Sequence, residues 1–479
     1  MAEKEYIVSL NSGVDYDAFN QEMIASTGAG NIPNRTVTVE DARPLSQRNT
    51  HYMLTEDEAI ALRKDSRVYG CEIKPEDRDD IVMGYDAQQL GSWRKTSNSS
   101  QYDLNWGMMR GIHREDVWDQ NVETTLPFNY NLTGKGIDVV IQDTGISTAH
   151  IEFTDSDGVS RIQEIDWFSA SGVTGTQSAN HYRDYDGHGT HVAGTVAGRT
   201  MGWAKDAKIY AVKVSGLEGT GDSGTGISVS QCFDVIKGWH NNKPIDPETG
   251  FKRPTVVNMS WGYGYSLSAT PTSGVYRGLS WNYGDVGFAN DNELFNTAGI
   301  VTKYGFPSSR KLNSRVASVD TDVQEMIDAG IHICIASGNK YYYIDKPNGQ
   351  DYDNTVVISG ITIPYHRGSS PYDDQAFIVG NIDIDYTSNL ENKAGSSNCG
   401  PGVNIYAPGT QIMSASSIDN PQGTNDIAAG TGNRQNHLLD AFQYIFKISG
   451  TSMASPNVAG MIACILEQTP GMTPDGMLA

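Results

Sequence analysis

Apolar runs alternate with stretches of helical spacing over residues 104–479. Four runs rich in Val and Ile have no polar face, as in strands of a parallel sheet that is buried on both sides. Helical spacing occupies the segments between them. This alternation predicts an α/β domain with a doubly wound, mostly parallel sheet flanked by helices. The strands are expected at Ile137–Ile141, Ala207–Val214, Thr255–Met259 and Ile331–Ala336, and the helices at His191–Gly198, Ser230–Trp239, Asp320–Ala329 and Ser455–Glu467.

The first part of the chain has a different pattern. Residues 1–76 follow the order strand, helix, strand, strand, helix, strand, which predicts a small ferredoxin-like α+β domain. Thr55 and Glu58 form a capping box before the second helix. Residues 77–103 are polar, with acidic clusters, Gly and Ser, and are interpreted as an exposed linker. Three long loops are expected within the larger domain, near 263–318, 340–372 and 411–446.

Composition excludes several classes of protein. The 479 residues include 35 basic and 57 acidic side chains, a net charge of −22, which argues against nucleic-acid binding. The longest apolar run, Val458–Leu466, is too short to span a membrane. The charged start at Glu3, Lys4 and Glu5 does not resemble a signal peptide, which favours an intracellular or particle-associated protein over classical secretion and leaves the compartment unknown. Five cysteines without a CxxC pair indicate neither a disulfide framework nor a zinc site.

Three motifs place reactive side chains at the ends of expected strands or at the starts of helices. Asp143 follows a buried run in VVIQDTGI, His188 precedes a helix in DGHGTHVAGTVAG, and Ser452 opens another helix in GTSMASPNVAG. A neighbouring imidazole can take the serine proton, and a carboxylate can orient that imidazole. Asn339 ends the strand in IHICIASGNK, and its amide with the backbone N–H of Ser452 would supply two donors to an oxyanion.

With these flanks and in this order, the motifs resemble the subtilisin-like serine proteases, the peptidase S8 family. Residues 198–214 are most similar to the proteinase K-like branch. The resemblance implies a serine endopeptidase that works through an acyl-enzyme. By this resemblance Asp143 orients, His188 is the general base and acid, Ser452 attacks, and Asn339 stabilises the oxyanion.

The same resemblance implies a substrate cleft for protein or peptide substrates. Ser260, Trp261 and Gly262 match the strand that flanks the P1 pocket, and Gly338 lies beside Asn339. Gly221 lies in a Gly-rich segment that would hold the substrate backbone. Residues 1–76 resemble an inhibitory propeptide of the inhibitor I9 type, which implies a zymogen. Its tail would occupy the cleft as a partner, and self-cleavage would fall within residues 77–103.

Some positions depart from the family pattern. Its frequent calcium loop looks absent, because Gly198–Gly202 carries no carboxylate, although Glu152 matches one carboxylate position. No cofactor is expected to be required, and calcium is left open. The HxxH formed by His188 and His191 is not expected to bind a metal, and His191 is interpreted as a packed helix residue. Lys340, at the rim of the P1 pocket, could attract acidic substrate side chains or be a solvated charge.

Two rival functions are compatible with parts of this pattern. One is a structural or assembly-associated protein, for instance a virion component, that retains a protease fold within a larger assembly. The intact set of Asp143, His188, Asn339 and Ser452 weighs against a dead enzyme. The other is an esterase with the same triad, but the segments around Gly221 and Ser260 favour an extended peptide. The sequence leaves the natural substrate, the P1 preference and the oligomeric state open.

Overall fold

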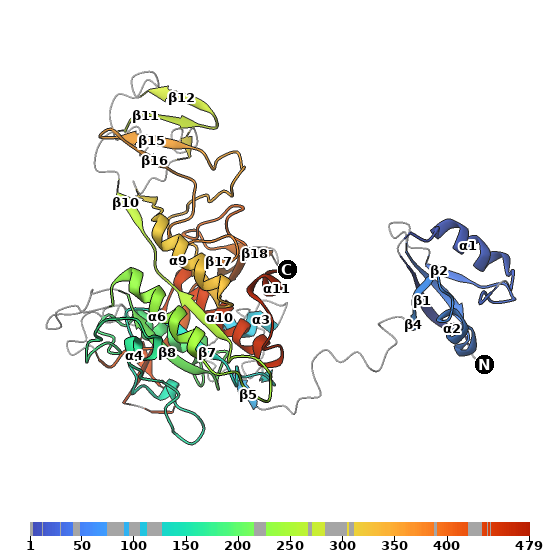
Figure 1. Ribbon diagram of the computed structural model, residues 1–479, viewed down its shortest axis with the longest axis horizontal. Helices are drawn as coiled ribbons and strands as arrows, with labels where there is room; N and C mark the ends of the chain where they lie inside the picture. The colour runs from blue at the N-terminus through green and yellow to red at the C-terminus, as the bar shows by residue number, and fades with distance from the viewer. Residues whose placement is uncertain are drawn as a thin grey trace. The chain divides into compact units, whose positions relative to one another are not determined.

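The chain forms two compact units, Met1–Gln88 and Gln89–Ala479, in a computed structural model (Figure 1). Each unit is described by itself. The structure describes residues 3–11, 13–28, 30–41, 48–73, 91–94, 106–112, 127–214, 227–266, 271–282, 304–305, 311–387, 390–419, 434–437, 439–440 and 442–479.

The N-terminal unit has the expected order of strands and helices. Its sheet is antiparallel with the order β2-β3-β1-β4, the arrangement of a ferredoxin-like fold. Thr55 and Glu58 form the capping box that begins α2. The elements are β1 (Lys4–Leu10), α1 (Tyr16–Ala25), β2 (Val39–Asp41), β3 (Asn49–Leu54), α2 (Glu56–Leu62) and β4 (Val68–Ile73).

The second unit is built on a seven-stranded sheet with the order β18-β17-β14-β9-β7-β8, to which β19 adds beside β17. All pairs are parallel except β17 with β18. The sheet therefore has the mostly parallel arrangement that the apolar runs predict. Its strands are β7 (Asp138–Asp143), β8 (Lys208–Lys213), β9 (Thr255–Met259), β14 (His332–Ala336), β17 (Phe377–Thr387), β18 (Leu390–Lys393) and β19 (Ile405–Pro408).

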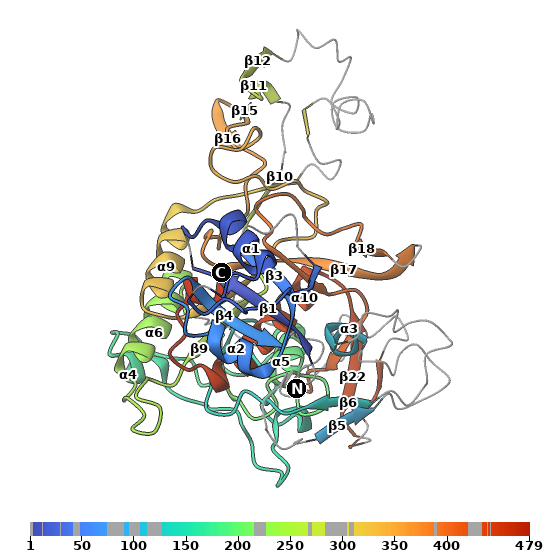
Figure 2. The ribbon, with the colours of Figure 1, turned by 90° about the vertical axis from the view of Figure 1, so that its right-hand side faces the viewer.

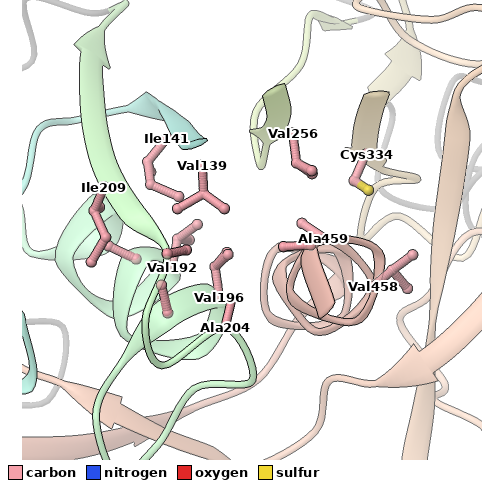
Figure 3. Packing of buried hydrophobic residues seen from close by; sticks show 14 of the residues in the cluster. Val139, Ile141, Val192, Val196, Ala204, Ile209, Val256, Cys334, Val458 and Ala459 are labelled. Atoms are coloured by element: carbon pink, nitrogen blue, oxygen red, sulfur yellow. The ribbon is translucent and has the colours of Figure 1, made fainter. Parts of the chain in front are cut away.

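Helices cover both faces of this sheet. Successive side chains of a strand point to opposite faces, so neighbouring residues of one strand pack against different helices. Val139 and Ile141 pack with α5 (His188–Ala197) and α10 (Thr451–Gln468), as Figure 3 shows. Val140 between them packs in the opposite core with α6 (Val229–Asn242) and α9 (Ala317–Asp328). Burial on both faces explains why these strands are apolar throughout.

The strand order creates one place where a crevice is expected. β7 is the first strand of the parallel sheet in the chain, and its neighbours β8 and β9 lie on opposite sides of it. The connection that leaves β7 leads to β8 on one side, and the connection that leaves β9 leads to β14 on the other side. In open α/β sheets, ligands bind where the connections of two adjacent strands diverge in this way, outside the carboxyl ends of the strands. Asp143 ends β7, and Ser260 directly follows β9.

The three segments predicted as long loops contain antiparallel sheets, which corrects the sequence interpretation. Some of these strands pair locally and others pair with partners far along the chain, and such short strands carry little periodic signal in the sequence. The sheet of order β12-β11-β15-β16 lies at the top of Figures 1 and 2, beyond β10. The strands are β10 (Gly264–Ser266), β11 (Pro271–Tyr276), β12 (Leu279–Asn282), β13 (Lys311–Asn313), β15 (Thr355–Ile358), β16 (Ile361–Pro364), β20 (Ile412–Ala415), β21 (Arg434–Asn436) and β22 (Tyr444–Ile448).

The predicted linker 77–103 is also partly wrong. Gly91–Arg94 forms β5, which pairs antiparallel with β6 (Pro127–Tyr130), so this stretch belongs to the larger unit. The sequence GSWR has a single large apolar residue, Trp93, and therefore shows none of the alternation that would predict a strand. The remainder of 77–103 lies outside the described residues. The remaining elements are α3 (Trp106–Ile112), η3 (Ile151–Phe153), α4 (Trp167–Ser171) and α11 (Pro474–Leu478).

Two further observations concern the chain as a whole. Across the residues that the structure describes, every helix is too short or too polar to cross a bilayer. All five cysteines are free thiols, and only Cys399 is partly exposed.

Candidate active site

Asp143 and His188 are in direct contact. Asp143 is the last residue of β7 and His188 the first of α5, and the Asp143 Oδ1 atom lies 2.8 Å from His188 Nδ1. The Asp143 side chain is 2% exposed and that of His188 22%. A carboxylate that accepts the Nδ1 proton fixes the tautomer of the imidazole, and Nε2 is left as the basic atom.

The surroundings of His188 favour its protonated form. Burial is the largest influence and lowers the pKa of His188, but Asp143, followed by Asp186 and Asp184, outweighs it and raises that pKa to about 9. The neutral imidazole, which a general base requires, is therefore populated on the alkaline side of neutrality.

Asp184 fixes the start of α5, a role that the sequence analysis missed. The carboxylate is fully buried and accepts hydrogen bonds from the Thr190 N–H at 2.8 Å and from the Thr144 hydroxyl at 2.9 Å. It also accepts the N–H of Gly187, at 2.9 Å, immediately before His188. Burial raises the pKa of Asp184 despite these hydrogen bonds. The available signal was the aspartate three residues before Gly187 in DYDGHGT, since Asp side chains often accept nearby backbone N–H groups in turns.

Ser452, the second residue of α10, is held against the end of β9. Its hydroxyl donates to the carbonyl oxygen of Ser260 at 3.1 Å, and the Ser260 hydroxyl donates to the carbonyl oxygen of Ser452 at 2.9 Å. Asn258 extends this network, because its Nδ2 donates to the Ser260 hydroxyl at 2.8 Å and its Oδ1 accepts from the Ser455 hydroxyl at 2.7 Å. The structure thus joins Asp143 to His188, whereas the hydroxyl of Ser452 is bonded to Ser260 and not to His188.

A cavity of about 190 Å³ lies beside Ser452. It brings together seven of the residues that the sequence analysis singled out, from the ends of β9 and β14 and the start of α10. Gly221 lies outside the described residues. The lining residues are Ser260, Trp261, Gly262, Tyr263, Gly264, Leu312, Asn313, Ala336, Gly338, Asn339, Lys340, Ser369, Thr451 and Ser452.

Asn339 is oriented so that its amide nitrogen can donate within this cavity. Its Oδ1 accepts the N–H of Thr451 at 2.8 Å and the Thr451 hydroxyl at 3.0 Å. An N–H donor can bond only to the amide oxygen, so Nδ2 is the outer end of the side chain. The N–H of Ser452, in the first turn of α10, has no acceptor within its helix. Asn339 and Ser452 line the same cavity, so it offers two donors of the kind that can stabilise an oxyanion.

Asn398 holds the turn that carries Asn339, and it is a second residue that the sequence analysis missed. It is fully buried, and its Oδ1 accepts the N–H groups of Lys340 at 3.1 Å and Tyr342 at 2.9 Å. Its Nδ2 donates to the Ser337 carbonyl at 2.6 Å. A side chain at Gly338 would place its Cβ 2.5 Å from the Asn398 amide, so glycine is required there. Nothing in the segment SSNCGPG distinguishes this asparagine in the sequence.

The surroundings of Glu152 do not fit the calcium site that the family often has. Its buried carboxylate accepts the N–H groups of Thr200 at 2.9 Å and Met201 at 3.0 Å. Its Oε1 also lies 2.6 Å from Nε2 of the buried His437. His437 Nδ1 accepts the N–H of Leu439, so Nε2–H is the donor to Glu152. These protein groups occupy the oxygens that a calcium ion would need.

His191 is a packed residue of α5, as expected. Its Nε2 lies 3.0 Å from the carbonyl oxygen of Ile412, and its ring makes an edge contact with Phe446. Burial lowers the pKa of His191 to about 3. The described residues contain no group of three or more His, Cys, Asp or Glu side chains suited to a metal ion.

The fold and the site define a class: a doubly wound α/β protein with an Asp–His pair and a helix-borne serine at the carboxyl edge of its sheet. Residues 134–478 match the model of the subtilase family, peptidase S8, and the chain belongs to this family.

The chain is also similar to several known proteins. The chain is 27% identical over 381 residues to subtilisin-like serine protease Pen ch 18 of Penicillium rubens, covering 78% of this chain and 52% of that protein. It is 25% identical to an extracellular serine proteinase of Thermus sp., covering 92% of this chain and 72% of that protein. The crystal structure of a cold adapted subtilisin-like serine proteinase covers 78% of this chain and 88% of its own, with 24% identity and a TM-score of 0.44. The chain thus spans about half the length of the Penicillium relative.

Proposed function

We propose that this chain is a serine endopeptidase that hydrolyses peptide bonds through an acyl-enzyme formed on Ser452. The observation that carries the proposal is the contact between Asp143 Oδ1 and His188 Nδ1, 2.8 Å, at the sheet edge whose strand ends also form the cavity that holds Ser452 and Asn339. Membership of the subtilase family supports it.

The reaction begins with the Ser452 hydroxyl, which turns from the Ser260 carbonyl towards Nε2 of His188. The neutral imidazole takes the hydroxyl proton as the oxygen attacks the peptide carbonyl, and Asp143 stabilises the imidazolium. The negative charge that develops on the carbonyl oxygen is bound by Asn339 Nδ2 and the N–H of Ser452. His188 then gives the proton to the leaving amine, and the acyl-enzyme remains. A water molecule, deprotonated by the same imidazole, hydrolyses this ester and restores Ser452.

The kinetic test compares Ser452→Ala with Ser449→Ala. The hydroxyl of Ser449 accepts the N–H of Gln411 outside the cavity, so this variant controls for loss of a nearby hydroxyl. Removing the nucleophile should lower kcat by about 10⁶, and the residual rate should come from oxyanion donors and binding. Ser449→Ala should retain most of the activity. Full peptidase activity in Ser452→Ala would overturn the proposal.

We also propose that the chain is made as a zymogen that cleaves itself. The compact ferredoxin-like unit Met1–Gln88, distinct from the unit that holds Ser452, supports this. The cut falls within residues 77–90, because a cut before Gly91 keeps β5 paired with β6. Its cut end, as a product-like strand, would then compete with substrates for the cleft.

Mass spectrometry of the purified wild type and Ser452→Ala tests self-cleavage. The wild type should be cut within residues 77–90, and Ser452→Ala should remain whole. A wild type that is fully active and uncut would refute the zymogen, and an inert wild type would favour the rival, an assembly protein that retains a protease fold.

A further inference from the structure

The Ser452 cavity contains one charged side chain among its described lining residues, that of Lys340. Lys340 is exposed, and within the described part of the chain no carboxylate forms an ion pair with it. The lining residues that the structure describes include no carboxylate either. An unpaired ammonium group at the mouth of a binding pocket favours a ligand of negative charge, although the protein as a whole carries a net charge of −22.

The larger cavity of the inserted sheet provides a contrast. It has a volume of about 340 Å³ and is lined by Arg277, Asp345 and Asp351 among others. There the charges satisfy one another, because Arg277 Nε and Nη2 lie 2.8 and 3.0 Å from the two carboxylate oxygens of Asp351. Asp345 accepts the N–H groups of Lys346 and Asp351. These groups require no charged ligand, whereas Lys340 lacks a counter-charge.

The backbone of Lys340 is fixed relative to the reacting groups. Asn398, which is fully buried, binds the N–H groups of Lys340 and Tyr342 and the carbonyl of Ser337. Asn339, the oxyanion donor, lies within this turn. The Lys340 side chain therefore starts from a rigid position next to the attacked carbonyl, and only its flexible stem must be ordered by a ligand.

The cavity lining also includes polar groups, beside the apolar side chains of Trp261, Tyr263 and Leu312. A side chain at Gly262 would place its Cβ 2.7 Å from the Ser369 hydroxyl, so the strand passes close to this hydroxyl. Asn313 also lines the cavity, and its Nδ2 donates a hydrogen bond to the Arg367 carbonyl oxygen at 3.1 Å. The volume of about 190 Å³ suits one side chain of the substrate. Because Ser452 and Asn339 share this cavity, that side chain belongs to the P1 residue, whose carbonyl is attacked.

We propose that this pocket selects an acidic P1 residue, glutamate or aspartate, and that Lys340 determines the preference. The inference rests on the proposed function, because it needs Ser452 as the nucleophile. Charge-assisted hydrogen bonds in a partly desolvated site are roughly twice as strong as neutral ones. A preference of about tenfold for Glu over Gln in kcat/KM is expected, which corresponds to about 1.4 kcal/mol.

The test uses three peptide p-nitroanilides that differ only at P1, which is Glu, Gln or Lys. The enzyme is the protein purified after expression of the full chain. The wild type should cleave them in the order Glu, Gln, Lys. Lys340→Met should reduce the Glu-to-Gln ratio of kcat/KM towards one, Lys340→Arg should keep it, and Lys340→Glu should favour Lys. Lys346→Met is the matched control, because Lys346 is exposed on the same segment and does not line the cavity. The control should leave the ratio unchanged.

The outcomes separate this inference from the proposed function. A wild-type ratio near one, or a ratio that Lys340→Met leaves unchanged in an enzyme that reacts with a fluorophosphonate, overturns the P1 preference alone. Absence of both cleavage and fluorophosphonate labelling overturns the proposed function, and the inference falls with it. A ratio that falls as ionic strength rises would support the electrostatic origin of the preference.

Discussion

Ser452 and Ser260 exchange two hydrogen bonds: the Ser452 hydroxyl donates to the Ser260 carbonyl at 3.1 Å, and the Ser260 hydroxyl donates to the Ser452 carbonyl at 2.9 Å. This pair fastens the first turn of α10 to the end of β9. Ser260 lines the cavity beside Ser452, and in the proposed mechanism its carbonyl holds the Ser452 hydroxyl in a resting position. If an N–H group of a bound substrate donated to the Ser260 carbonyl instead, the Ser452 hydroxyl would be free to turn towards His188.

Ser260→Ala should destabilise the folded chain by about 1 kcal/mol, because it removes one buried hydrogen bond and leaves the Asn258 amide with one acceptor fewer. It should also lower kcat, since the first turn of α10 is held less firmly. Urea unfolding and steady-state kinetics measure the two effects. Unchanged stability would show that the exchange contributes nothing to the packing of α10 on β9.

Asn339→Ala should lower kcat by about 10²- to 10³-fold with little change in KM, because the amide acts on charge that develops only in the transition state. The matched control is Asn404→Ala, whose amide bonds the backbone of Ile378 and Ala376. This control should affect stability only. An equal loss of kcat in both variants would contradict the role of Asn339 in the oxyanion site.

The rate should rise with pH across the alkaline range. Burial lowers the pKa of His188, but Asp143 favours the imidazolium and the pKa is raised to about 9. The neutral base therefore forms as the pH rises towards that value. A profile of kcat/KM against pH reports this titration. Asp186→Asn should move the midpoint down, because Asp186 contributes to the raised pKa. Asp157→Asn, at an exposed site, should leave it in place, and a midpoint below the ordinary histidine value of about 6.5 would contradict the account.

Glu152→Gln should destabilise the fold at neutral pH by about 2 kcal/mol, because hydrogen bonds to a buried charge are lost or weakened. Burial raises the pKa of Glu152, but His437 and Thr200 outweigh it and lower that pKa to about 2. A depressed carboxyl pKa stabilises the fold above the unfolded value and loses this effect as pH falls through the folded value. The difference between wild type and variant should therefore shrink as pH falls from about 4.5 towards 2.

Denaturant unfolding at several pH values measures this difference, with the exposed Glu164→Gln as control. A gap that is independent of pH between these limits would show that the charge of Glu152 does not matter. Added calcium should not restore the variant, because protein groups occupy the carboxylate in the wild type.

The central sheet and the chemistry at its edge could be predicted from the sequence because both depend on local signals. Runs such as Val139–Ile141 are apolar on both faces, and Asp143 and Ser452 sit in distinctive flanks. The inserted sheets could not be predicted, because β11 pairs with β15 about 80 positions further along the chain. Their strands, with residues such as Thr272 and Ser273, carry no strong alternation.

The supporting residues of the site were missed for a similar reason. Asn398 acts through backbone N–H groups 58 and 56 positions away, which only the folded chain brings to it. Asp184 binds the N–H groups of the nearby Gly187 and Thr190, and its signal in the sequence was only that of a local cap. The Glu152–His437 contact joins residues 285 positions apart. The bond between Ser452 and Ser260 was also not foreseen, because it depends on the rotamer of one hydroxyl. Motifs thus indicate the candidate reacting groups, and tertiary contacts determine what orients them.

The most direct measurement is the reaction of the purified protein with a fluorophosphonate, followed by peptide mass spectrometry to locate the adduct. Labelling should occur on Ser452, should quicken as pH rises, and should disappear in Ser452→Ala and fall steeply in His188→Ala. A protein that hydrolyses peptides while the adduct lies on another residue, or that never reacts, would contradict a nucleophilic role for Ser452.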